Sequence, residues 1–181
     1  MSGVRTAVIE TERLTLLPLS VEHAEEMAGV LSDPALHAYI GGRPATVEQL
    51  RIRYRRLAAG SPDPAFSWCN WVLRERAGRG TAGSGELSGT VQATVTPHRT
   101  RPEETVAEVA WVVGTPWQGR GFATEAARGL VGWLAEQGIG TVIAHIHPHH
   151  EASGAVARAA GLRPTDEWHD GEVRWRRSLG E

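Results

Sequence analysis

The hydrophobic and polar positions of this chain follow two periodicities, which separate strands from helices. Apolar residues that alternate or run together predict strands, and apolar residues that recur every three or four positions predict helices. The predicted strands cover residues 13–19, 66–73, 87–96, 106–113, 141–146, 164–169 and 172–178, and the predicted helices cover 21–31, 46–59, 124–137 and 152–160. The order β-α-α-β-β-β-α-β-α-β-β predicts an α/β (α+β) fold in which helices pack on a mixed sheet.

Local residues mark where several of these elements begin and end. Thr46 and Gln49 have the spacing of a capping box at the start of a helix. Asp33-Pro34 is expected to end the preceding helix, because the residue before a proline disfavours the helical conformation. Gly138 predicts a helix end, and Asp170-Gly171 predicts a tight hairpin turn between the last two strands.

The composition is that of an ordinary globular chain and excludes several function classes. With 181 residues, 41% of them hydrophobic and 22% charged, we expect one domain over residues 1–181. The glycine-rich segment Arg76–Gly85 predicts a loop between strands rather than a linker. A formal net charge of −2 favours neither a nucleic acid nor a membrane surface as partner. No apolar run is long enough to span a bilayer, and the N-terminus lacks the pattern of a signal peptide.

Two residue types restrict the chemistry further. Cys69 is the only cysteine, so no intrachain disulfide can form, and we expect a cytoplasmic location. Lysine is absent, which is most simply a bias of composition. Its absence nevertheless excludes a lysine base and enzymes that form a Schiff base through lysine.

The segment between the predicted strand 106–113 and the next helix has the features of an anion site. It reads Gln118-Gly119-Arg120-Gly121-Phe122-Ala123, and the helix follows at once. Glycines let the backbone approach a ligand closely, and the first amides of a helix have no partner within the helix. The helix dipole adds partial positive charge at the same place. A pyrophosphate is therefore the expected ligand.

Three nucleotide-binding patterns compete for this segment. A Walker A loop requires a lysine, so it is excluded. A dinucleotide fingerprint requires glycine or alanine where Thr124 stands, and it opens a first βαβ unit, whereas this segment follows several strands that are predicted to be antiparallel. The third pattern, Q/R-x-x-G-x-G/A, matches from Gln118 to Ala123. A glycine-rich turn with a purely structural role also remains open.

The chain resembles the GNAT acetyltransferase superfamily over most of its length, in particular its Rim-type (ribosomal-protein-alanine acetyltransferase-like) branch. The resemblance lies in Arg13-Leu14-Thr15-Leu16 with Asp33-Pro34, in the segment from Pro116 to Ala126, and in His147–Ser153 followed by Val156–Leu162. It implies a mixed, mostly antiparallel sheet of about seven strands. Helices would cover both faces, and two central parallel strands would splay apart to hold the cofactor.

The resemblance also implies which residues contact acetyl-CoA. Backbone groups of Trp111, Val112 and Val113 would hydrogen-bond the pantetheine arm like an added strand. The pyrophosphate would lie on the amides of Gln118, Gly119, Arg120, Gly121, Phe122 and Ala123, with the Thr124 hydroxyl as a further donor. The side chains of Arg120 and Arg128 are candidates for phosphate contacts, although Arg128 also fits a solvated helix face. His150 replaces the family's usual asparagine, which contacts the pantetheine.

Two residues are assigned catalytic roles by the same resemblance. Glu108 lies where many GNAT enzymes carry a general base, and an amine with a pKa near 10 needs one because it is mostly protonated at neutral pH. Glu86, Glu104 and the histidines are alternative bases, and Glu108 also fits a structural role in the sheet. Ser153 is the candidate that stabilises the departing thiolate, unless it only caps the helix.

Four histidines, His145, His147, His149 and His150, lie within six residues. Three interpretations remain open: a metal site completed by carboxylates, one histidine that serves the acyl site, and local hydrogen bonding. No metal is expected. In the family, the acceptor groove lies between the first helices and the last hairpin, which corresponds here to 33–43 and 167–172. Its candidate lining residues are His37, Tyr39, Arg43, Trp68 and Asn70.

The sequence thus predicts an N-acetyltransferase that moves an acetyl group from acetyl-CoA to a primary amine in a ternary complex, as a monomer or homodimer. The acceptor stays open among a protein N-terminus, an amino acid, a polyamine and an aminated antibiotic. Two alternatives remain: a non-catalytic module that binds acyl-CoA, and a metal-dependent enzyme at the histidines.

Overall fold

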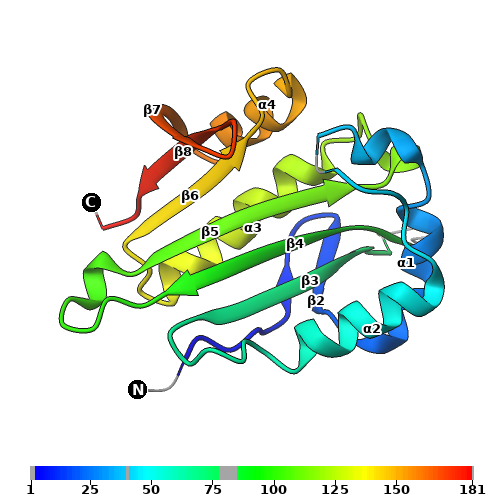
Figure 1. Ribbon diagram of the computed structural model, residues 1–181, viewed down its shortest axis with the longest axis horizontal. Coiled ribbons are helices and arrows are strands. Elements are labelled where there is room, and N and C mark those ends of the chain that lie inside the picture. The colour runs from blue at the N-terminus through cyan, green and yellow to red at the C-terminus, as the bar shows by residue number, and fades with distance from the viewer. Residues whose placement is uncertain (1–2, 40, 78–84, 181) are drawn as a thin grey trace.

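The computed structural model describes residues 3–39, 41–77 and 85–180, which form one eight-stranded sheet with helices on both faces (Figure 1). The strands are β1 (Ile9–Glu10), β2 (Leu14–Pro18), β3 (Ser67–Glu75), β4 (Leu87–Thr96), β5 (Val106–Val113), β6 (Thr141–Ile146), β7 (Arg163–His169) and β8 (Glu172–Ser178). The α-helices are α1 (Ala24–Val30), α2 (Val47–Ala58), α3 (Phe122–Glu136) and α4 (Glu151–Ala159), and short 3-10 helices lie at Val21–His23, Pro34–His37, Pro102–Glu104 and Thr115–Trp117. No helix among these described residues is both long enough and apolar enough to cross a membrane.

The strand order in the sheet is β1-β2-β3-β4-β5-β6-β8-β7, and only β5 and β6 are parallel. This confirms the predicted mixed, mostly antiparallel sheet and the order of its elements. The sequence missed β1, because two residues are too few to reveal an alternation, so the sheet has eight strands rather than about seven. Helix α3 begins at Phe122, two residues before the predicted start. Of the predicted loop Arg76–Gly85, residues 78–84 lie outside the described part of the chain.

The predicted boundary signals have clear structural counterparts. Thr46 Oγ1 accepts the Gln49 amide while the Gln49 side chain accepts the Thr46 amide, which is a complete capping box. Gly138 adopts a φ of 80° just after α3, and the Ile139 amide donates to the Leu134 carbonyl. The β7–β8 turn places Asp170 and Gly171 at φ of 48° and 80°, as a tight hairpin requires.

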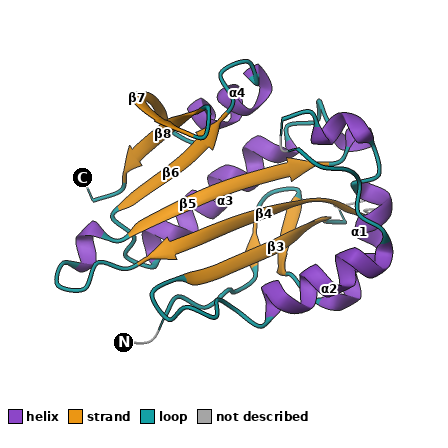
Figure 2. Cartoon of the chain, in the orientation of Figure 1, coloured by secondary structure: helices purple, strands orange, loops and turns teal. Residues whose placement is uncertain are grey.

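Each face of the sheet is covered by a different pair of helices (Figure 2). Helices α3 and α4 pack on one face, in a core that includes Trp71, Phe122, Leu130 and Ala157. Helices α1 and α2 pack on the other face over β3 and the start of β4. They leave the part of this second face over β5, β6 and β8 without a covering helix (Figure 1). The central strands therefore have one buried face and one accessible face.

The two parallel strands separate after a short paired stretch. Residues Val106–Glu108 of β5 pair with Thr141–Ile143 of β6, and the pairing ends there. Beyond this point β5 continues to Val113 and β6 to Ile146, and the ribbons diverge (Figure 1). We call the diverging segments 109–113 and 144–146 the fork. Helices α3 and α4 follow β5 and β6, so both helix N-termini lie at its open end.

A glycine holds β4 close to the fork strand β5, and we expect its replacement to destabilise the fold. A Cβ atom at Gly89 would lie 2.2 Å from the carbonyl oxygen of Val112. Gly89→Ala must push the two backbones apart, and it should lower the free energy of unfolding by about 1–3 kcal/mol. The control Gly132→Ala lies in α3, where a Cβ meets no atom within 4 Å. It should leave stability unchanged or raise it by up to about 1 kcal/mol, because alanine favours helix. Urea unfolding measures both, and equal stabilities would contradict the prediction.

Candidate active site

A row of free amides lies at the open end of the fork, between β5 and α3. The backbone N–H groups from Gly119 to Thr124 have no hydrogen-bond acceptor among the described residues. Gly119 and Gly121 adopt φ of 78° and 79°, the left-handed region that glycine enters without strain. Helix α3 begins directly after them without a side-chain cap. We call residues 119–124 the cradle, and its unpaired donors fit the pyrophosphate of a CoA ester.

The strand β2 holds the cradle in place from one side. Arg13 donates from Nη1 to the Arg120 carbonyl at 2.7 Å and from Nε to Glu125 Oε1 at 2.7 Å. Its guanidinium also lies over the Phe122 ring. Burial opposes ionisation of Glu125, but hydrogen bonds from Thr11 and Arg13 outweigh it and lower the pKa of this carboxyl. The early Arg13 motif thus fixes the backbone of the cradle and leaves its amides available.

The two arginines that were candidates for phosphate contacts have other partners in the structure. Arg120 Nη2 lies 2.8 Å from Glu75 Oε1, and its guanidinium stacks over Phe122. Arg128 donates from Nε to the Ala159 carbonyl at 2.9 Å. A phosphate contact by either side chain would therefore have to share these arrangements.

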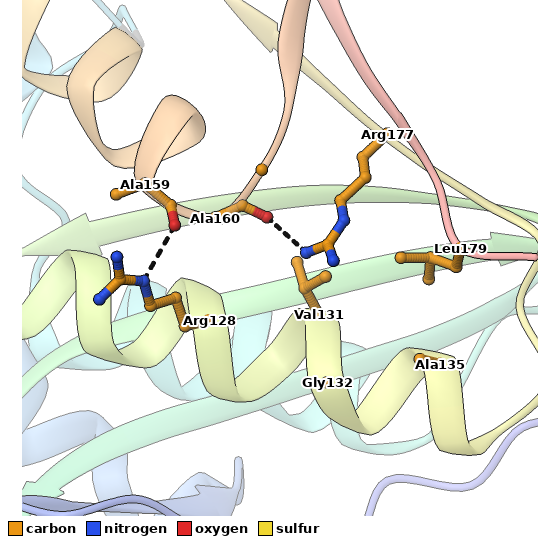
Figure 3. Close-up of a pocket in the computed structure, with 9 residues that line it drawn as sticks. Arg128, Val131, Gly132, Ala135, Ala159, Ala160, Arg177 and Leu179 are labelled. Carbon is orange, nitrogen blue, oxygen red and sulfur yellow. Dashed lines mark hydrogen bonds between the residues drawn. The ribbon is translucent and has the colours of Figure 1, made fainter. Parts of the chain in front are cut away.

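Arg128 also borders a hollow of about 450 Å³ between α3, the end of α4 and β8 (Figure 3). In this hollow Arg177 donates to the Ala160 carbonyl at 2.8 Å, next to the bond from Arg128 to Ala159. The two guanidiniums thus satisfy carbonyls at the C-terminal end of α4, where a helix has unpaired acceptors. The hollow is lined from the C-terminal half of α3 and does not include residues of the cradle.

The predicted pantetheine strand has one free edge. Trp111, Val112 and Val113 pair with β4 on one side, and β6 has already diverged on the other. The Gln118 side chain donates to the Val113 carbonyl at 3.0 Å and so links the strand end to the cradle. Backbone groups along this edge are available to an extended ligand, as the resemblance implies.

Glu108 lies at the point where the fork opens, as the last β5 residue paired with β6. Its Oε1 is 2.7 Å from His145 Nδ1 on β6. The Glu108 side chain is 50% exposed, whereas that of His145 is only 8% exposed. Glu104, an alternative base, lies before the opposite, paired end of β5 and contacts Arg101 and His98. Glu108 is thus the carboxylate that the fold places at the fork.

The strand registers place further candidate residues on the accessible face of the sheet. Trp68 pairs with Thr94, which in turn pairs with Glu108, so the three share one face. Asn70 lies two residues further along β3 on the same face. The predicted groove residues Trp68 and Asn70 are therefore on the same side of the sheet as Glu108. Arg43 is exposed and forms no hydrogen bond or ion pair with the described residues.

The segment that follows α1 reaches both sides of the fork. Asp33 accepts a hydrogen bond from Thr115 Oγ1 at 2.7 Å, just before the cradle. Tyr39 stacks on His150 on the β6 side, with ring centroids 4.3 Å apart. Ser153 Oγ is 3.4 Å from His150 Nε2, and Ser153 bonds to no helix backbone group among the described residues. The capping alternative for Ser153 therefore finds no support, and its role towards the thiolate stays a prediction.

The four clustered histidines have different surroundings. His145 contacts Glu108, which favours the interpretation that one histidine serves the acyl site. His147 Nδ1 accepts the His149 amide at 3.1 Å, and His150 lies under the Tyr39 ring. Within residues 3–39, 41–77 and 85–180, no three histidine, cysteine or carboxylate side chains gather to hold a metal ion. Sequence reasoning missed both the His145 contact and the Tyr39 stacking, because each joins segments that are distant in the chain.

Acidification is expected to destabilise the fold partly through His150. Burial lowers the pKa of His150, His147 lowers it further, and Glu172 opposes the effect. The unfolded chain therefore binds this proton first as the pH falls below 6.5, and the free energy of unfolding decreases. His150→Asn should reduce this pH dependence between about pH 7 and 5. Urea unfolding at several pH values measures it. His23, whose pKa is lowered by burial and by Arg74, is present in both proteins, so identical pH profiles would contradict a contribution from His150.

Comparison with known proteins agrees with this geometry. The model of the acetyltransferase (GNAT) domain family matches residues 13–163. A GNAT-family acetyltransferase from Bacillus anthracis is 20% identical with a TM-score of 0.75, over 97% of this chain and 100% of its own. The ribosomal L7/L12 alpha-N-protein acetyltransferase RimL, in complex with coenzyme A, is 15% identical with a TM-score of 0.72, over 95% and 98%.

A third solved structure is the acetyltransferase from Salmonella typhimurium that modifies the N-terminal serine of the 50S subunit protein L7/L12. It is 16% identical with a TM-score of 0.73, over 95% of this chain and 99% of its own. A search of curated proteins finds no match. The chain belongs to the GNAT acetyltransferase family, a family of acyltransferase enzymes that use acetyl-CoA, and RimL-type ribosomal-protein acetyltransferases are among its structural neighbours.

Proposed function

We propose that this enzyme transfers the acetyl group of acetyl-CoA directly to a primary amine in a ternary complex. The observation that carries the proposal is the placement of Glu108 at the opening of the fork, with the cradle at the same open end. The cradle would fix the pyrophosphate, and the free edge of β5 would hold the pantetheine in the fork. The thioester then lies near the accessible face, where an amine can approach.

The proposed reaction assigns one task to each group. Glu108 removes a proton from the ammonium form of the acceptor, directly or through a water molecule, since a half-exposed carboxylate admits water. The amine nitrogen attacks the thioester carbonyl and a carbon–nitrogen bond forms. The carbon–sulfur bond then breaks, and the thiolate of CoA leaves with a hydrogen bond from Ser153 or takes up a proton. Holding both substrates in one site supplies the entropic part of the rate enhancement.

The acceptor is proposed to be a primary amine on a protein N-terminus or a small molecule. The accessible face over β5 and β8 is open along the strands rather than closed into a cavity (Figure 1). This openness allows an extended peptide as well as a small amine. The RimL-type neighbours act on a ribosomal protein N-terminus, which makes peptides with a free α-amine the first acceptors to test.

The test is release of free thiol when the protein meets acetyl-CoA and a panel of amines. The panel contains N-terminal peptides, amino acids, polyamines and an aminoglycoside, and mass spectrometry identifies the acetylated product. We expect thiol release with at least one acceptor class and a product heavier by one acetyl group. Calorimetric binding of acetyl-CoA without thiol release on any acceptor would instead favour a non-catalytic acyl-CoA-binding module. Full activity after exhaustive chelation would exclude a metal-dependent reaction.

A further inference from the structure

We propose that His145 and Arg174 are positioning residues that orient Glu108 for proton transfer. This inference rests on the proposed function, because it deepens the role assigned to Glu108. It comes from three side chains on neighbouring strands, Glu108 on β5, His145 on β6 and Arg174 on β8, which form one continuous hydrogen-bonded chain.

The sheet register brings the three residues together. His145 is in register with Arg174 in the antiparallel pair of β6 and β8, and Glu108 is the last residue of β5 paired with β6. His145 Nδ1 lies 2.7 Å from Glu108 Oε1, and Arg174 Nε donates to His145 Nε2 at 3.0 Å. Arg174 is in turn 3.6 Å from Glu167 on β7, and the His169 ring lies 5.0 Å from that of His145.

These contacts define which nitrogen of His145 carries the proton. An arginine Nε always donates, so the Nε2 atom that accepts from Arg174 must present a lone pair. The ring proton is then on Nδ1, and it points at Glu108 Oε1. His145 is held as a neutral donor to the carboxylate. It cannot take a second proton without losing the bond from Arg174.

The arrangement orients the base without occupying it. Glu108 Oε1 accepts from His145, while Oε2 has no hydrogen-bond partner among the described residues. An exposed glutamate samples many rotamers, and one bond from a side chain that is 92% buried restricts that freedom. The Oε2 atom is then free to accept a proton from the acceptor amine or from a bridging water. Arg174 acts one step further away, by fixing the tautomer of His145.

The first test measures the tautomer and requires no acceptor. In protein labelled with ¹⁵N-histidine, the ring signals of His145 are assigned by their loss in His145→Asn. We expect the Nδ1 signal in the range of protonated nitrogen and the Nε2 signal in that of unprotonated nitrogen. In Arg174→Met, the Nε2 signal should move towards the protonated range. An Nε2–H tautomer in the wild-type protein would overturn the proposal.

The second test separates positioning from a structural role through kinetics. His145→Phe keeps the ring volume but removes the donor, so kcat should fall roughly 10- to 100-fold. The KM for acetyl-CoA should be unchanged. The side-chain amide of His145→Asn can donate from near the Nδ1 position, so this variant should recover most of kcat. His98→Phe, which changes a histidine beyond the paired end of β5, is the control and should keep the wild-type rate.

The outcomes distinguish this inference from the proposed function. A wild-type rate in His145→Phe would overturn the positioning role while the transferase function stands. Equal loss in His145→Phe and His145→Asn, with lowered melting temperatures in both, would also overturn it, since it would indicate a structural role. A wild-type protein that binds acetyl-CoA but acetylates no amine would refute the proposed function, whereas the tautomer measurement would still report on the geometry.

Discussion

In the Glu108→Gln variant we expect kcat to fall by about 10²- to 10⁴-fold near neutral pH, the range that a general base supplies. Glutamine has the shape of glutamate and can still accept the bond from His145, but it cannot take a proton from the acceptor. The acceptor amine loses its own proton as the pH rises towards its pKa, so the variant should regain rate at high pH. Initial rates of thiol release between pH 6 and about 10 measure this profile.

Two comparisons make this prediction sharp. Acetyl-CoA affinity, measured by calorimetry, should be equal in the wild type and in Glu108→Gln, because the cradle is unaltered. Glu103→Gln removes an exposed carboxylate from the 3-10 helix before β5 and should leave the rate unchanged. A pH profile of Glu108→Gln that matches the wild type would remove Glu108 as the base. Loss of rate in Glu104→Gln alone would move the base to the opposite end of β5.

Local signals explain why so much of the architecture could be predicted from the sequence. The apolar alternation of β5 and the period of α3 each lie within one segment, and the glycines at 119 and 121 mark the turn between them. The amide cradle follows from that local pattern alone, since backbone donors at a helix start need no distant partner. The short β1 escaped because its two residues are defined by pairing with β2 rather than by any pattern of their own.

The contacts that tune the site could not be predicted, because they depend on strand register. His145 was recognised as a strand histidine near the cofactor, but its partner Glu108 is 37 residues away. That pairing exists only because the parallel strands separate at Glu108 and Ile143, and a shift by one residue would turn His145 to the other face. Arg174 was not singled out for the same reason. Arg120 was expected near phosphate, but its distant partner Glu75 holds the side chain elsewhere.

The second large effect is expected at the cradle, where Gly121→Trp should weaken acetyl-CoA binding by at least about 100-fold. The loss of two or more hydrogen bonds to charged phosphate oxygens accounts for that factor. Gly121 has a φ of 79°, and a Cβ there would lie 3.2 Å from Arg13 Nη2, in the space beside the α3 amides. The indole would therefore strain the turn and crowd the surface that the pyrophosphate needs. Isothermal calorimetry with acetyl-CoA and with CoA measures the loss.

Backbone strain alone must be separated from blocking of the cradle, and Gly60→Trp provides the matched control. Gly60 also has a positive φ, 84°, and a Cβ there meets no atom within 4 Å, but it follows α2 and lies outside the cradle. Gly60→Trp should lose about 1–2 kcal/mol of stability from the left-handed conformation and keep its affinity for acetyl-CoA. If Gly121→Trp bound acetyl-CoA as tightly as Gly60→Trp, the pyrophosphate would have to bind elsewhere. The free amides from 119 to 124 would then need another ligand.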